Sequence, residues 1–296
     1  MFEIWDILRP LTKFCLYLAM FMAAGGVIFE VLFRRFVPEV TQRHVSHLIG
    51  IAAWAGLALV GARLVVAAGS LGGDLASMTD PVLLGLVMKS SLGLSSVVAG
   101  IGLAMITVIG RVKARGEQAA RIVAAATVLL SLTLVGHATT LGAITGVLLA
   151  LHLGGVAFWL GALLPLRQLC GGAGDVDSMA MLADVADRFG RIAQRVVPVL
   201  IVAGVAYAAI LTGSVAAMLT SGYGLALLVK IGLVAGLLGL AARNRFRIVP
   251  ALQAGDLSAV LRLRRTIDWE ILVAMAVLVM SSLLTSSLTL PMRGME

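Results

Sequence analysis

Long, uninterrupted apolar stretches follow one another along the whole chain. Each is long enough to cross about 30 Å of hydrocarbon as a helix, which takes roughly 20 residues at 1.5 Å of rise per residue. The stretches are continuously apolar, whereas the strands of a membrane barrel alternate apolar and polar positions over about ten residues. The pattern therefore predicts eight helical spans: Leu11–Phe33, Val45–Gly69, Val82–Gly110, Arg121–Ala138, Gly142–Leu166, Ile192–Gly213, Gly222–Ala242 and Trp269–Leu290.

Composition points to the same class of protein. Hydrophobic residues make up 60% of the chain and charged residues 13%, with a mean hydropathy of +1.04. Soluble domains are about 45–50% apolar and about 25% charged. Glu3 and Asp6 stand where a cleavable signal peptide would carry basic residues, so no leader is predicted. We expect an all-α, polytopic membrane helical bundle that forms a single domain over residues 1–296.

Basic residues are confined to alternate loops. The second, fourth and sixth loops (Ser70–Pro81, Thr139–Leu141 and Ser214–Ser221) contain no Lys or Arg. By the positive-inside rule, the other loops face the cytoplasm and both termini lie outside. The net charge of +8 then indicates attraction to anionic membrane lipid, and no nucleic-acid partner is predicted. The cytoplasmic loops carry Arg34, Arg35, Arg43, Arg111, Lys113, Arg115, Arg167, Arg188, Arg191, Arg243, Arg245, Arg247, Arg262, Arg264 and Arg265.

Ionisable residues inside a span are functional candidates, because lipid makes them costly. Glu30, Arg63 and Glu270 lie near the ends of predicted spans, where their charges are expected to reach the interface. Lys230 lies seven or eight residues inside the outer boundary of its span by count along the sequence. Its side chain either extends to the surface or bonds a partner on another helix.

His152 lies about ten residues into the fifth span, about 15 Å deep by helical rise. An imidazole buried there without a partner would cost roughly a few kcal/mol, so His152 must hydrogen-bond, bind a metal or face water. Trp159 lies two turns further along the same helix face. The opposite face carries a ladder of small residues, which predicts close contact with another helix. The ladder consists of Gly146, Ala150, Gly154, Ala157 and Gly161.

Soft metal ligands gather toward the outer side. His137 ends the fourth span there, and the chain has 13 methionines, among them Met78, Met88 and Met218. Thioethers suit Cu(I) and imidazole suits copper in both oxidation states, although methionine also fills membrane cores. His44 and His47 begin the second span on the cytoplasmic side, where they need no role beyond the interface.

Cysteine usage and motifs exclude several classes of protein. Cys15 is expected near the outer end of the first span and Cys170 in a cytoplasmic loop, so the two cannot pair. The sequence has no CxxC, no zinc-ligand spacing, no phosphate-binding loop, no GxSxG and no GxGxxG. No enzymatic activity is predicted.

Several segments together resemble the CopD (copper resistance D) family of bacterial inner-membrane proteins. The likeness is dense from about residue 121 to the end and looser before it. The chain departs from the family pattern at Leu149, where members often carry a further histidine, and at Ala162, where they carry glycine. The segments that carry the resemblance are Gly136-His137-Ala138, Leu151-His152-Leu153, Phe158-Trp159-Leu160-Gly161-Ala162-Leu163-Leu164-Pro165-Leu166, Arg188-Phe189, Leu211-Thr212-Gly213, Tyr223-Gly224, Leu228-Val229-Lys230, Asn244-Arg245, Pro250 and Glu270.

This resemblance implies a multi-pass protein of the bacterial inner (plasma) membrane with periplasmic termini. It implies copper, as Cu(I) rather than Cu(II), imported from the periplasm or delivered for cuproprotein assembly. A separate periplasmic chaperone of the CopC type is the expected partner. A b-type haem redox protein and a non-transporting assembly factor are the alternatives. The roles assigned are an outer capture ligand for His137, a buried ligand for His152, packing below it for Trp159, a structural or gating role for Lys230, and auxiliary thioether ligands for Met78, Met88 and Met218.

Overall fold

The computed structural model describes residues 4–110, 116–135, 142–212 and 215–286, and these ranges contain helices and no strand. Short 3₁₀ segments η1 (Arg34–Phe36), η2 (Ala76–Thr79) and η3 (Leu132–Leu134) and a π-helical turn η5 (Asn244–Ile248) lie between the α-helices. The α-helices are α1 (Trp5–Phe33), α2 (Glu39–Gly72), α3 (Pro81–Lys89), α4 (Ser91–Ile109), α5 (Glu117–Ser131), α6 (Ala143–Gly172), α7 (Val176–Thr212), α8 (Val215–Thr220), α9 (Gly222–Arg243), α10 (Val249–Gln253) and α11 (Ser258–Ser286).

The prediction of eight spans is confirmed, because the described residues contain eight helical segments long and apolar enough to cross a membrane. One boundary is wrong in the third span, predicted over 82–110. Ser90 has an extended backbone and separates α3 from α4, and its hydroxyl accepts a hydrogen bond from the Leu92 N–H at 3.2 Å. Met88 and Lys89 therefore belong to the short helix α3 and not to the spanning helix α4.

Two other helices extend well beyond the predicted spans. Helix α7 begins at Val176, well before Ile192, where the sixth span was predicted to start. Helix α11 begins 11 residues before Trp269, where the eighth span was predicted to start. Asp256 explains the early start of α11. Its carboxylate accepts from the Ser258 N–H at 2.9 Å and from Arg262 Nη2 at 2.7 Å. Hydrogen bonds from Ser258 and then Arg262 lower the pKa of Asp256 to about 2, so the interaction persists at neutral pH.

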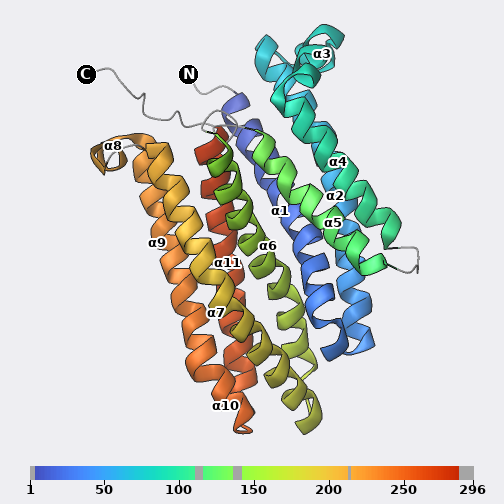
Figure 1. The fold of residues 1–296 in the computed structure, drawn as a ribbon, viewed down its shortest axis with the longest axis vertical. Helices are drawn as coiled ribbons and strands as arrows, with labels where there is room; N and C mark the ends of the chain where they lie inside the picture. Colours follow the sequence, from blue (N-terminus) through green and yellow to red (C-terminus); the bar gives the residue numbers. More distant parts are fainter. Residues whose placement is uncertain (1–3, 111–115, 136–141, 213–214, 287–296) are drawn as a thin grey trace.

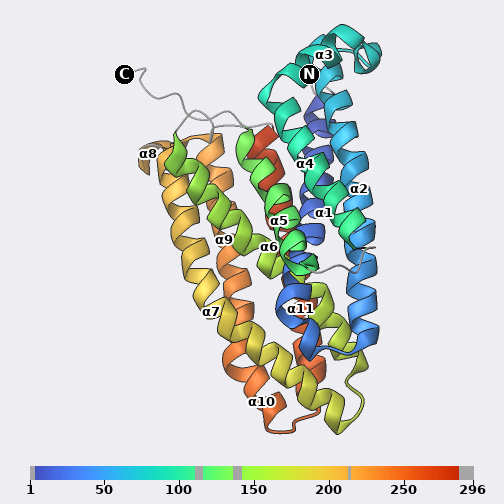
Figure 2. The same ribbon diagram turned by 45° about the vertical axis from the view of Figure 1, so that its right-hand side comes forward.

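The helices run between two ends of the bundle (Figures 1 and 2). At the terminal end lie the first turn of α1, the α2–α3 connection, α8 and the last turn of α11, and here Lys13 Nζ donates to the Thr285 carbonyl at 2.8 Å. At the arginine-rich end lie the α1–α2, α6–α7 and α9–α11 connections. Cys170 is buried in α6 rather than placed in a loop as predicted, and both Cys15 and Cys170 are free.

Helix α1 is the centre of the bundle and packs against α2, α5, α6 and α11. Its backbone meets that of α6 where Gly25 faces Gly161. A Cβ added at Gly25 would lie 2.9 Å from Gly161 Cα, and one added at Gly161 would overlap the backbone of Gly25. The inner part of the predicted small-residue ladder, Ala157 and Gly161, thus makes the expected close contact. The outer part does not, because nothing lies within 4 Å of a Cβ added at Gly146 or Gly154.

An aromatic cluster joins α1, α6 and α7 near the arginine-rich end. Phe189 of α7 stacks on Phe158 with ring centroids 5.1 Å apart and meets Trp159 edge-on at 6.3 Å. Phe33 of α1 approaches the same ring at 6.5 Å. Such pairs add about 0.5–1.5 kcal/mol each beyond their buried area. The cluster fixes the orientation of Trp159, which belongs to the site described below.

The glycine contact between α1 and α6 yields a direct test. Gly161→Ala should lower stability by about 1–3 kcal/mol, because the added methyl has no space against the α1 backbone. Gly154→Ala on the same helix is the matched control, and it should be neutral or stabilising by about 0.5–1 kcal/mol through reduced chain entropy. Thermal unfolding in detergent measures both variants. Equal melting temperatures for the two would show that the close approach does not constrain the bundle.

Candidate functional site

The His152 side chain bridges α6 and α7. Its Nδ1 lies 3.2 Å from the Leu200 carbonyl oxygen. A carbonyl oxygen only accepts, so Nδ1 carries the proton and Nε2 keeps a free lone pair. Gly204, one turn further along α7, makes room for the ring, because a Cβ at that position would lie 2.8 Å from Nδ1. The prediction that His152 needs a partner is confirmed, and the partner is a backbone group on a neighbouring helix.

Lys230 of α9 lies within electrostatic range of His152. Its side chain is half-buried, and no carboxylate of the described residues forms an ion pair with it. A cation held by the imidazole would therefore be repelled by the ammonium group. This arrangement places the imidazole and a positive charge near each other within the terminal half of the bundle.

The predicted methionine ligands are spread over the terminal end. Met78 packs beside Trp5 and Gly69, and Met88 is 45% exposed on α3. Met218 belongs to α8, on the opposite flank of the bundle from α3 (Figure 1). His137 lies outside the described residues. Within the described residues, no three His, Cys, Asp or Glu side chains gather as a metal site. Among the predicted ligands that lie in the described residues, Met218 alone belongs, with His152, to the second half of the chain.

Trp159, further along α6 from His152, contacts a second polar group. It lies seven residues along α6, about 10 Å by helical rise, on the same helix face. Its indole Nε1 donates to Glu270 Oε2 at 3.3 Å, while Asn244 Nδ2 donates to Glu270 Oε1 at 2.6 Å. The Thr266 hydroxyl donates to Asn244 Oδ1 at 2.5 Å and so orients the carboxamide. Trp159 therefore does more than pack below His152, because it holds a buried acid.

A pocket of about 250 Å³ opens beside this acid, between α6, α7, α9 and α11. Most of its wall is apolar or aromatic. Its polar lining groups are Glu270, Asn244, Gln194 and Arg245, and Arg245 is paired with Asp187 of α7. Phe246 also lines the pocket and is 67% exposed on the outside of the bundle. Such a cavity combines an apolar wall with a few convergent polar groups, as small-ligand sites do.

The π-helical turn η5 brings Asn244 and Arg245 into this pocket. Pro250 has no N–H to donate to the carbonyl four residues before it, so the regular helical pattern cannot continue. The Val249 N–H instead bonds the Asn244 carbonyl, five residues back. Single π turns of this kind are frequent at functional sites. Asn244, Arg245 and Pro250, which belong to the sequence pattern of the family, thus form one structural unit, in which the proline favours the π-helical turn that carries the other two residues.

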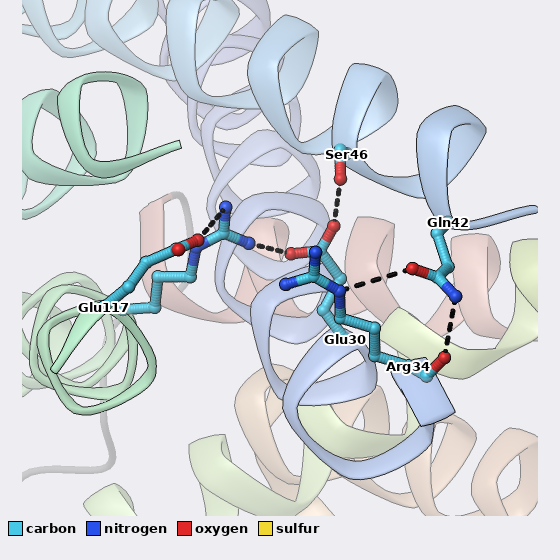
Figure 3. A network of polar contacts seen from close by, with 6 residues as sticks. Glu30, Arg34, Gln42, Ser46 and Glu117 are labelled. Atoms are coloured by element: carbon cyan, nitrogen blue, oxygen red, sulfur yellow. Dashed lines mark hydrogen bonds and ion pairs between the residues drawn. The ribbon is translucent and has the colours of Figure 1, made fainter. Parts of the chain in front are cut away.

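A second buried acid, Glu30 of α1, is held differently (Figure 3). It accepts hydrogen bonds from Ser46 of α2 and from Arg121 of α5, with which it forms an ion pair. Arg121 also pairs with Glu117 at 2.9 Å. Beside this network, Arg34 Nε donates to Gln42 Oε1 at 3.3 Å. These contacts tie α1, α2 and α5 together near the arginine-rich end.

The expectation that Glu30 and Glu270 reach the interface is wrong. They are 6% and 3% exposed, respectively. The error for Glu270 follows from the late predicted start of its span, because α11 begins 12 residues before it. Glu270, Asn244 and Trp159 lie in separate segments of the sequence. Nothing in their spacing indicates that the three side chains meet.

Comparison with known families covers most of the chain. The family model described as "Copper resistance protein D-like, N-terminal domain" matches residues 3–147, and the model described as "Copper resistance protein D" matches residues 183–284. The segment between them, residues 148–182, contains His152 and Trp159. No curated protein sequence and no solved structure matches the chain. Together with the eight apolar helices, the two matches show that this chain belongs to the copper resistance protein D family of multi-pass membrane proteins.

Proposed function

We propose that this protein is a permease that moves copper through its helical bundle, with His152 as the ligand inside the membrane. The bond from His152 Nδ1 to the Leu200 carbonyl carries the proposal. Metal-binding histidines usually donate their second ring N–H to a backbone carbonyl or carboxylate, which fixes the tautomer and leaves the other nitrogen for the metal. An imidazole prepared in this way within a membrane span is a functional candidate.

Copper enters from the terminal end, which we assign to the periplasm. The thioethers of Met78, Met88 and Met218 lie at this end, and His137 is assigned as the capture ligand before His152. Thioether and imidazole ligands together favour Cu(I). Import of periplasmic copper, or its delivery for cuproprotein assembly, follows from this order of ligands. A separate periplasmic chaperone of the CopC type is the proposed donor.

Lys230 controls passage in this proposal. Its charge opposes a cation on His152, so copper rests there only when the ammonium group moves away or is neutralised. Met218 is the auxiliary thioether of this half of the chain, on the helix α8 that connects α7, which bonds His152, to α9, which carries Lys230.

Substitution of His152 tests the proposal. In His152→Ala, copper uptake into proteoliposomes should fall to the level of protein-free vesicles, while stability changes by only about 0.6 kcal/mol, the average for one inter-helix hydrogen bond in a membrane protein. His152→Met should keep part of the uptake, because a thioether binds Cu(I) but cannot replace the imidazole hydrogen bond. His44→Ala, at the arginine-rich end, is the control and should transport normally. Normal uptake by His152→Ala would make His152 a packing residue.

Orientation is tested with reporter fusions. Basic residues gather at the arginine-rich end, so we assign that end to the cytoplasm. A fusion after Gly73 should report the periplasm, and fusions after Gly174 and Gly255 should report the cytoplasm. The opposite pattern would reverse the assigned direction of copper entry.

Metal selectivity is measured on the purified protein. Cu(I) or Ag(I) should bind more tightly than Zn(II) at neutral pH, because thioethers are poor ligands for zinc. The affinity for Ag(I) should fall in Met218→Leu, whereas Met105→Leu within α4 should bind as the wild type does. Equal or tighter binding of Zn(II) would contradict the copper assignment.

A further inference from the structure

Glu270 is a buried acid without a counter-ion. It is 3% exposed, and its two oxygens accept from Trp159 and Asn244, both of which are neutral donors. Within the described ranges, no Lys, Arg or His forms an ion pair with Glu270. Glu30 is comparably buried at 6% but has the guanidinium of Arg121. The bundle therefore holds one buried acid as an ion-pair partner and the other as an isolated carboxyl group.

An isolated carboxylate in a low-dielectric interior is costly, so the site favours binding a positive charge. A metal ion requires several ligand atoms, and Glu270 supplies the one carboxyl group of the pocket. No cluster of His, Cys, Asp or Glu surrounds it within the described residues. A proton needs only the carboxyl group itself. The ligand that fits this site is a proton.

We propose that Glu270 is the proton-binding site of the bundle, which exchanges its proton with the arginine-rich end through the adjoining pocket. The role of this proton as the coupling ion for copper rests on the proposed function. The identity of the proton site does not, because it follows from the burial and bonding of Glu270 alone.

The pocket supplies a path for the proton. Its volume of about 250 Å³ has room for several water molecules, and water in a protein interior needs polar partners. Asn244, Gln194 and Arg245 provide such partners in the wall of the pocket that Glu270 also lines. Pro198, which also lines the pocket, frees the Gln194 carbonyl from its helical hydrogen bond and adds an acceptor.

Several other charges near the site form ion pairs, and Arg188 of α7, beside Phe189, lies over the Phe36 ring at 4.1 Å from the ring centroid. Arg245 is the other charged group that lines the pocket, and its partner is Asp187. On α6 and α11, Arg167 and Asp268 pair with each other. On α7, Arg191 pairs with Asp187, and on α1, Glu30 pairs with Arg121. Lys13 of α1 bonds Thr285 at the terminal end. Lys230 lies in the part of α9 nearer to that end.

Trp159 lies between the proposed copper ligand and the proposed proton site, because it follows His152 on α6 and bonds Glu270. A Cu(I) ion that leaves His152 along α6 approaches the carboxyl group that Trp159 holds. The field of this cation favours the ionised carboxylate, because an opposite charge stabilises it. The O–H bond of Glu270 then breaks, its electron pair stays on the carboxylate, and the proton passes to water in the pocket. One positive charge arrives as one leaves, so the buried site stays electrically neutral.

Infrared difference spectroscopy on the metal-free protein tests the proton site directly. At neutral pH, the wild type should show the C=O stretch of a protonated carboxylic acid that shifts in D₂O. The band should be absent from Glu270→Gln and retained in Asp268→Asn, a half-exposed acid two residues away on the same helix. No such band in the wild type, or an unchanged band in Glu270→Gln, would overturn the proposal.

Coupling is measured in proteoliposomes that contain a pH-sensitive dye. Copper uptake by the wild type and by Asp268→Asn should be accompanied by proton movement, which should disappear in Glu270→Gln and be partly retained in Glu270→Asp. Copper-driven proton movement that persists in Glu270→Gln would refute the coupling role. If the wild type moves no copper at all, the permease function fails, and the infrared band still decides whether Glu270 binds a proton.

Discussion

The backbone contact between α1 and α6 positions the other parts of the structure. Gly25 and Gly161 allow the two helices to approach until neither position has space for a Cβ. Helix α6 carries both His152 and Trp159, so its distance from α1 fixes the depth and direction of both side chains. Close packing of small residues is the main source of helix association where lipid removes the hydrophobic drive. Phe33, Phe158 and Phe189 then set the rotation of α6 against α7.

In the part of the chain that the structure describes, two carboxyl groups are buried in the bundle, and one is stabilised by an ion pair whereas the other receives hydrogen bonds from neutral donors. Glu30 lies where α1, α2 and α5 converge, and Arg121 and Ser46 reach it from two helices. The resulting ion pair is a fixed structural connection (Figure 3). Glu270 faces a pocket and receives only neutral donors from Trp159 and Asn244. Glu270 therefore has no charged partner among the described residues, whereas Glu30 is held in an ion pair with Arg121.

The polar groups of the C-terminal half form one series along the bundle. His152 lies toward the terminal end, Trp159 and Glu270 follow, and Asn244 and Arg245 lead to the arginine-rich end. The π-helical turn and Pro250 place the last two residues in the pocket. The series lies on α6, α11 and the π-helical turn η5, and each step is a hydrogen bond, a shared helix face or a shared pocket wall. In a permease, such a series serves both the metal and its coupling ion.

The sequence by itself determined the membrane class, the eight spans and the alternation of basic loops, because lipid requires long apolar helices and charge asymmetry is visible residue by residue. It also identified the family and the need of His152 for a partner. Only the tertiary structure decided that this partner is Leu200, that Glu30 and Glu270 are buried, and that Trp159 meets Glu270. These contacts join residues up to 111 positions apart in the chain. Hydropathy indicates which segments cross the membrane. The pairing of side chains depends instead on which helix faces pack together, and no local sequence pattern specifies that packing.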